Sequence, residues 1–241
     1  MAGTRGPRGD SPRARYREQT RGEIKEIAWR QLAEGGGGNI ALTRIAKEVG
    51  LSGPALYRYF DSRDALLTEL IRDAYADLAA AVGAAAGRSV REPARDRLLG
   101  LGAACRDWAV AHPHRYLLIG GTPVPGYTAP ADTLDSARAV LGPFLGVFAG
   151  ARPTASVAPL IEQTHQWVAS DETVAAWVRE QAPDLAADRY AVALAGALFA
   201  WPQMHGVISL EVSGQFTGMG HDGATLLSCQ LDTLADSFQL R

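Results

Sequence analysis

Residues 42–66, LTRIAKEVGLSGPALYRYFDSRDAL, predict a helix, a tight turn, a second short helix and the start of a third. Apolar residues recur at helical spacing over the first eight positions, with charged residues between them. Gly50 follows where a glycine commonly ends a helix. Ser52 can cap the next helix, with Pro54 in its first turn, where the missing N–H group of proline costs little.

The second of these helices carries side chains that indicate a function. Leu56 and Phe60 are four residues apart and can share a buried face. Tyr57 and Arg58 then lie largely off that face. A short helix that is held at a fixed angle and presents aromatic hydroxyls and a guanidinium is typical of a helix-turn-helix motif that reads the DNA major groove.

This stretch resembles the TetR family of transcriptional repressors, and the close match covers about residues 24–70. The residues that carry the resemblance are Ile45-Ala46, Gly50-Leu51-Ser52, Leu56-Tyr57-Arg58-Tyr59-Phe60 and Ser62-Arg63-Asp64-Ala65-Leu66-Leu67. The resemblance implies that Arg58 points toward bases or nearby phosphates, and that the DNA backbone is gripped around the motif. The DNA-binding residues expected on this basis are Thr43, Arg44, Ser52, Gly53, Pro54, Ala55, Tyr57, Arg58, Tyr59 and Arg63.

The charge distribution agrees with a DNA-binding N-terminal segment. Residues 1–63 hold 12 Lys/Arg and 7 Asp/Glu, whereas residues 64–241 hold 12 and 19, so the acidic remainder argues against further nucleic-acid contact. No run of eighteen apolar residues and no signal peptide is present, so we expect a cytoplasmic protein. The two cysteines, Cys105 and Cys229, are expected to be buried thiols in a reducing compartment.

The helical patterns and the lack of strand alternation predict an all-α protein with an N-terminal three-helix DNA-binding domain and a C-terminal helical domain. Residues 1–15 are rich in Gly, Pro and Arg and are expected to be a disordered basic tail, which either adds DNA contacts or has no role. We expect the DNA-binding domain over residues 16–75 and an effector-binding and dimerisation domain over residues 76–241. The glycine run 35–38 is expected to be a surface loop.

No motif favours catalysis, a cofactor or a metal. His112 and His114 flank a proline and lack a nearby cysteine or carboxylate, so they are expected to be surface residues at a helix end. The glycine run lacks the Gly-Lys-Ser/Thr of a phosphate-binding loop, and the segment Gly50–Gly53 is followed by Pro54 rather than forming a nucleophile elbow. We therefore expect no enzyme, no cofactor and no metal site.

A second informative segment is residues 193–216, ALAGALFAWPQMHGVISLEVSGQF. Its Trp201, His205 and Gly206 resemble the Trp/His/Gly cluster of one TetR subgroup, on the helix that pairs across the dimer in that subgroup. This resemblance implies a four-helix interface between two subunits. The apolar residues expected in it are Leu194, Leu198, Ile208, Leu210, Leu226, Leu227, Leu231, Leu234 and Phe238; the alternative is that both helices belong to a monomer core.

The resemblance also implies a small-molecule pocket, which is commonly apolar with a few polar groups. The candidates for effector binding are Trp108, Tyr116, His165, Trp167, Trp201, Met204 and His205, and Tyr127 and Trp177 are further aromatic candidates. The expected function is thus a homodimeric regulator of a palindromic operator, most simply a repressor that a small molecule releases. A constitutive DNA-binding protein without an effector and an all-α enzyme are the alternatives, and activation rather than repression stays open.

Overall fold

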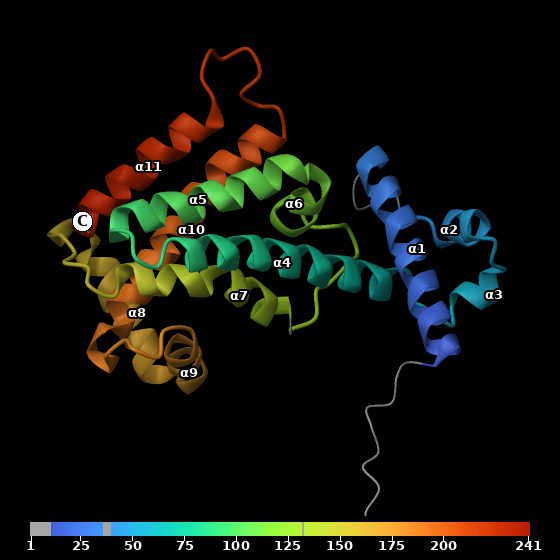
Figure 1. The fold of residues 1–241 in the computed structure, drawn as a ribbon, viewed down its shortest axis with the longest axis horizontal. Helices are drawn as coiled ribbons and strands as arrows, with labels where there is room; N and C mark the ends of the chain where they lie inside the picture. The colour runs from blue at the N-terminus through green and yellow to red at the C-terminus, as the bar shows by residue number, and fades with distance from the viewer. Residues whose placement is uncertain (1–10, 36–39, 132) are drawn as a thin grey trace, which may run out of the picture. The chain divides into compact units, whose positions relative to one another are not determined.

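The computed structural model describes residues 11–35, 40–131 and 133–241, and these residues form helices and loops without any strand (Figure 1). The all-α prediction is therefore confirmed over this part of the chain. In order, the elements are α1 Pro12–Gly35, α2 Leu42–Val49, α3 Gly53–Leu56, α4 Arg63–Arg88, α5 Ala94–Ala111, α6 Pro113–Gly120, α7 Thr133–Leu145, η2 Gly146–Phe148, η3 Ala155–Val157, α8 Ala158–Ser170, α9 Glu172–Gln181, η4 Ala187–Arg189, α10 Tyr190–Val212 and α11 Gly223–Ser237.

Two sequence-based expectations fall partly outside the described residues. Of the tail, residues 1–10 lie outside them, but residues 12–15 already belong to α1, so the expectation of disorder up to residue 15 is wrong there. Of the glycine run, Gly35 is the last residue of α1 and residues 36–38 lie outside the described part.

The chain divides into two compact units. Unit 1 comprises the chain up to Leu70 together with Pro123–Thr128, and unit 2 comprises Ile71–Thr122 and Ala129–Arg241. The boundary predicted from the sequence lay between residues 75 and 76, and the second segment of unit 1, Pro123–Thr128, was not predicted. That segment contains a turn in which Tyr127 N–H donates to Val124 O at 3.1 Å, with Pro125 and a left-handed Gly126 between them.

Unit 1 is held together by a small apolar core from α1, α2, α3 and the start of α4. Ile24, Ile45, Leu56 and Leu66 are fully or almost fully buried in it. The turn after α2 depends on Gly50, whose φ of 75° is costly for other residues, and Leu51 N–H donates to Ala46 O at 2.8 Å in a Schellman-type ending. Together these features set the angle at which α3 leaves α2.

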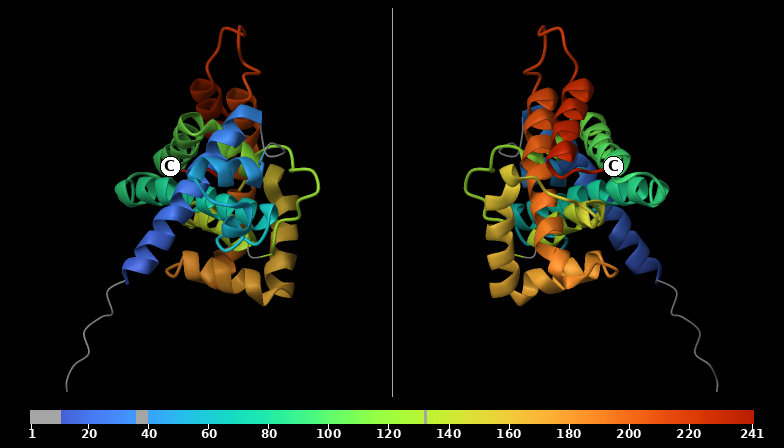
Figure 2. Two further views of the ribbon diagram at one scale, coloured as in Figure 1. Left: turned by 90° about the vertical axis from the view of Figure 1, so that its right-hand side faces the viewer. Right: turned by 90° about the vertical axis from the view of Figure 1, so that its left-hand side faces the viewer.

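Unit 2 is built around α10, which packs against α5, α7, α8 and α11 (Figures 1 and 2). Close packing requires a glycine at position 196, because a Cβ atom there would lie 2.3 Å from the Phe148 ring. The segment Ala187–Val212 is long and apolar enough to cross a membrane by length and composition, but 61% of its apolar window is buried inside the protein. Burial of this kind is what a central core helix shows.

Most of the apolar residues that the sequence assigned to a dimer interface are buried within one chain. Leu194, Ile208, Leu227, Leu231, Leu234 and Phe238 are each 2% exposed or less. Leu231, for example, lies against Gly102 of α5, where an added Cβ would meet its Cδ1 atom at 2.2 Å. The expectation that these six contact a second subunit is therefore wrong. Of the original nine, Leu198, Leu210 and Leu226 remain partly or largely exposed.

Candidate nucleic-acid interface and effector site

The candidate reading element is α3 with the turn that follows it. Ser52 occupies the N-cap position, but its hydroxyl makes no capping hydrogen bond; its backbone carbonyl accepts instead from Ala55 N–H at 2.9 Å. Tyr59 N–H and Phe60 N–H both donate to Leu56 O, so the chain tightens immediately after the helix. Because Leu56 and Phe60 are buried, the residues between them are carried on a turn that is anchored at both ends.

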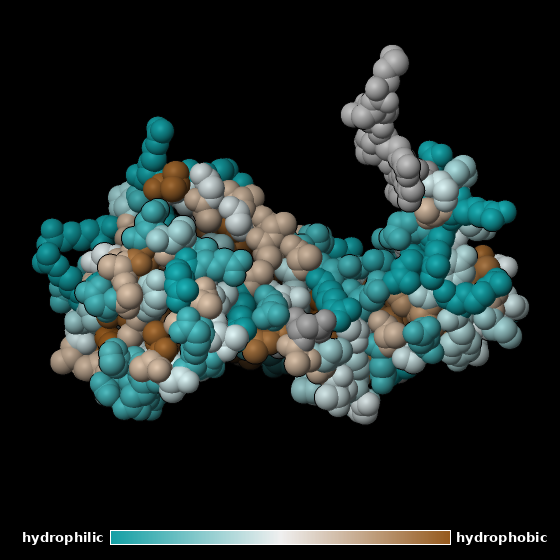
Figure 3. Space-filling view, turned by 90° about the horizontal axis from the view of Figure 1, so that it is seen from below, coloured by the Kyte–Doolittle hydropathy of each residue, from teal (hydrophilic) through white to brown (hydrophobic). Residues whose placement is uncertain are grey.

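The predicted DNA-binding residues differ in how far they reach solvent. Tyr57 is 52% exposed, and Arg58 is also exposed, so both can reach an external partner. Thr43, Ser52, Gly53 and Pro54 are exposed as well, whereas Ala55, Tyr59 and Arg63 are half-buried. In the view of Figure 3, hydrophilic residues cover most of unit 1, at the right, which suits a polar partner such as the DNA backbone.

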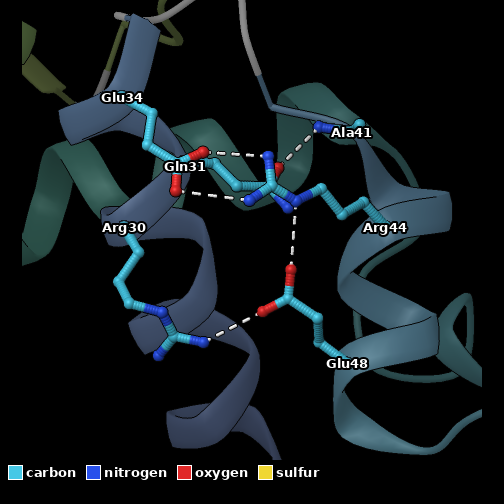
Figure 4. Close-up of polar contacts among 6 residues, drawn as sticks. All are labelled: Arg30, Gln31, Glu34, Ala41, Arg44 and Glu48. Atoms are coloured by element: carbon cyan, nitrogen blue, oxygen red, sulfur yellow. Dashed lines mark hydrogen bonds and ion pairs between the residues drawn. The ribbon is translucent and has the colours of Figure 1, made fainter.

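Arg44 is engaged within the protein (Figure 4). Its guanidinium lies 2.9 Å from Glu34 of α1 and 3.1 Å from Glu48 of α2, and Glu48 also pairs with Arg30 at 3.0 Å. The hydrogen bond and charge of Glu34, with a smaller contribution from Glu48, raise the pKa of Arg44. These bonds to Glu34 of α1 and Glu48 of α2 favour a role for Arg44 in bracing α2 against α1. Its role in DNA binding stays a prediction.

Two arginines of α1 bind the end of the reading element, and no sequence pattern had singled them out. Arg17 Nη2 donates to Arg58 O at 3.3 Å, and Arg21 Nη1 donates to Tyr59 O at 2.5 Å. The Arg21 guanidinium also lies 4.3 Å from the centre of the Phe60 ring and 2.6 Å from Glu69 of α4. The partners are 41 and 38 residues apart in sequence, which is why periodicity could not reveal them.

In unit 2 the structure brings together three of the predicted effector residues. Tyr116 Oη lies 2.9 Å from His205 Nδ1, and the Trp201 ring stacks on the His205 ring with a 6.0 Å centroid separation. His205 Nε2 lies 3.4 Å from Ser209 Oγ. Gly120 permits this approach of α6 to α10, because a Cβ atom at Gly120 would lie 3.0 Å from His205 Cε1.

Burial sets the protonation of this cluster. It lowers the pKa of His205, so the imidazole is neutral at pH 7, and it raises the pKa of Tyr116 to about 12. A neutral imidazole has one donor and one acceptor nitrogen. One of the two nitrogens, Nδ1, faces the Tyr116 hydroxyl and the other, Nε2, faces the Ser209 hydroxyl, so each has a polar partner. The cluster places a few hydrogen-bonding groups in an otherwise apolar core, as small-molecule sites commonly do.

The remaining effector candidates are not part of this cluster. Met204 is buried beside Gly102, and Trp108 is buried with its ring 5.4 Å from that of His112. His165 and Trp167 lie on the outer side of α8, where Trp167 is 42% exposed. Tyr127 belongs to unit 1, where its hydroxyl lies 2.9 Å from Thr68 Oγ1.

The cysteines and histidines give no further site among the described residues. Cys105 is buried, which raises its thiol pKa to about 12, but Cys229 is exposed, so the expectation that both are buried is wrong. Within residues 11–35, 40–131 and 133–241, no group of three or more His, Cys, Asp or Glu side chains could hold a metal ion.

The lowered pKa of His205 predicts a pH dependence of stability. The unfolded chain protonates His205 near the ordinary pKa of about 6.5, whereas the folded chain does so only at lower pH. The unfolded state then binds more protons, so this residue makes the free energy of unfolding fall as the pH drops below about 6.5. His205→Gln should flatten the profile of urea midpoints between pH 7.5 and 5.5. Parallel profiles for the two proteins would contradict this assignment.

Known protein families match both the N-terminal and the C-terminal part of the chain. Residues 24–70 match the family model of bacterial regulatory proteins of the tetR family, and residues 98–234 match a tetracyclin repressor-like C-terminal domain. The HTH-type transcriptional regulator Rv1816 of Mycobacterium tuberculosis is 36% identical over 201 residues, which are 83% of each protein.

Solved structures show the same fold. The crystal structure of the regulatory protein SCO4313 has 44% sequence identity and a TM-score of 0.75, covering 94% of this chain and 100% of that one. A tetR-family transcriptional regulator from Streptomyces coelicolor has 18% identity and a TM-score of 0.56, covering 91% and 80%, which supports the fold alone.

Proposed function

The chain belongs to the TetR family of DNA-binding transcriptional regulators, and from this premise we propose that it is a cytoplasmic homodimeric repressor that a small molecule releases from a palindromic operator. The DNA-binding part of this proposal is supported by the anchored turn after α3. It presents Tyr57 and Arg58 to solvent between two buried residues, within the net positive N-terminal segment. Arg58 is proposed to contact base edges, and Tyr57 is proposed to contact a phosphate.

Dimerisation is proposed through the exposed faces of α10 and α11. Between them runs a groove of about 550 Å³ lined by Pro202, Gln203, Gly206, Val207, Leu210, Gln230 and Thr233. Leu210 is 47% exposed although it is a large apolar residue, and Gly206 has no neighbouring side chain at its Cβ position. A second copy related by two-fold symmetry would cover this face and place two reading elements on two half-sites.

The effector is proposed to bind at the cluster of Tyr116, Trp201 and His205. The flat face of Trp201 and the paired donor and acceptor of the Tyr116–His205 bond suit an uncharged or weakly polar compound with an aromatic or aliphatic part. The effector changes operator occupancy only if it binds the DNA-free arrangement of the dimer more tightly than the DNA-bound one. This differential affinity is the property to measure.

Selection of an operator from randomised DNA, followed by a panel of aliphatic and aromatic compounds, tests this proposal. At least one compound should release the operator and change tryptophan emission. Trp201→Ala should leave operator affinity nearly intact and abolish release, whereas early melting together with loss of DNA binding would show that Trp201 is structural. Loss of release in Trp167→Ala but not in Trp201→Ala would move the site to α8. Operator binding that no compound affects would favour a constitutive DNA-binding protein.

A further inference from the structure

The carbonyl groups at the end of the reading element have donors from another helix. The last carbonyls of a helix lack partners within it, and cationic side chains that bind them also interact favourably with the helix dipole. Here Arg21 of α1 donates to Tyr59 O at 2.5 Å, immediately after the two residues proposed to touch DNA. Arg17, one helical turn earlier, donates to Arg58 O at a longer 3.3 Å.

Arg21 is held in place from two further sides. Glu69 of α4 fixes its guanidinium through a 2.6 Å contact, and the ring of Phe60 lies beneath it at 4.3 Å. Its side chain is 20% exposed, so these contacts are only partly screened by solvent. One planar group thereby joins α1, the turn after α3 and the first part of α4.

We infer that Arg21 is a positioning residue for DNA recognition: by holding the carbonyl of Tyr59, it fixes the direction in which the turn presents Tyr57 and Arg58. The inference rests on the proposed DNA contacts of this turn. Lysine could pair with Glu69, but its single ammonium lacks the planar fork that binds a carbonyl and a carboxylate while lying on a ring. The geometry therefore requires arginine and not merely a positive charge.

The test compares Arg21→Gln and Arg21→Lys with the unmodified full-length chain on a selected operator duplex and on a scrambled duplex. Arg21→Gln should weaken operator binding about tenfold, equivalent to about 1.4 kcal/mol. Binding to the scrambled duplex should weaken less than operator binding, by no more than the loss in Tyr57→Phe. The salt dependence on either duplex should stay unchanged, because no charged phosphate contact is removed. Arg21→Lys should restore less than half of the lost discrimination on a logarithmic scale. Arg30→Gln is the matched control, since Arg30 also lies on α1 but pairs with Glu48 of α2 at an exposed position, away from the reading turn.

A merely structural role and a direct DNA contact give different results. If Arg21 only stabilises the fold, Arg21→Gln lowers the melting temperature, but discrimination well below that temperature is unchanged. If Arg21 binds phosphate directly, both duplexes are weakened equally and the log–log salt slope becomes shallower by about one. Either result overturns the inference. Should Arg21→Gln fail to fold, Arg21→Lys decides alone: full discrimination by the lysine variant overturns it.

A double-mutant cycle with Arg58→Ala connects Arg21 to the reading turn. If Arg21 acts through that turn, its effect on discrimination should nearly vanish once Arg58 is removed, whereas independent residues give additive effects. Additivity overturns the inference. If Arg58→Ala itself changes neither affinity nor discrimination, the proposed DNA contact fails. If Arg58→Ala acts and Arg21→Gln does not, only the inference about Arg21 fails.

Discussion

Replacement of Gly206 by glutamate is expected to split the dimer and abolish operator binding. Gly206 is exposed on α10, and a Cβ atom at this position meets no neighbouring atom within 4 Å, so the substitution leaves the protomer intact. In the proposed dimer the same position is covered by the second subunit, where an unpaired carboxylate costs several kcal/mol. A symmetric interface incurs this cost twice. A monomer carries one reading element and cannot occupy two half-sites.

Analytical sedimentation and an operator-binding titration measure this effect, and the melting temperature shows whether the fold is preserved. Gly87→Glu is the matched control, because Gly87 is also exposed on a helix of unit 2 with open space at its Cβ position. A dimer that persists in the Gly206 variant would place the interface elsewhere. A charge at Leu231 could not serve as this test, since Leu231 is 1% exposed and its loss would damage the core of one chain.

Arg58→Ala is expected to weaken specific operator binding by about 1–3 kcal/mol, the range for a bidentate contact between arginine and guanine. Arg58 is exposed, so its removal should not disturb the buried neighbours Leu56 and Phe60. Selection on a randomised operator library should show lost preference at one position in each half-site. Tyr57→Phe provides the contrast, because loss of a phosphate contact weakens all sequences roughly equally. Unchanged affinity and preference in the Arg58 variant would remove it from the interface.

The helix-turn-helix motif was predictable because its determinants are local. Gly50 ends α2 and Ser62 caps α4, with Ala65 N–H donating to Ser62 Oγ at 3.0 Å, and these features need only a few neighbouring residues to be recognised. The apolar spacing of α10 was equally visible. This spacing does not show which side of the helix faces a second chain, since every residue of α10 from Tyr190 to Ala197 is buried within one chain. Six of the nine expected interface residues were therefore misplaced.

The candidate effector site was less predictable than the motif, because it depends on which side of each helix turns inward. On α8 the buried residue is Thr164, whose hydroxyl lies 2.9 Å from Ala191 O, and this orientation leaves His165 and Trp167 outside. The aromatic side chains of α8 had favoured the prediction that His165 and Trp167 face inward. Arg21 and Tyr59 are 38 positions apart, and Tyr116 and His205 are 89 positions apart. Helical periodicity relates residues a few positions apart, so it could not predict either contact.

The second segment of unit 1 limits how this regulator can be recombined. Thr68 Oγ1 donates to Asp64 O at 2.9 Å, so in its contact with Tyr127 it accepts the phenolic hydrogen from a residue encoded 59 positions downstream. A chimera that joined residues 1–70 to another sensor domain would lack this phenol and the turn that supports it. The graft would carry the whole helix-turn-helix sequence and still be an incomplete module. Hybrid biosensors built from this chain therefore need Pro123–Thr128 supplied with the reading head, or Thr68 redesigned for its absence.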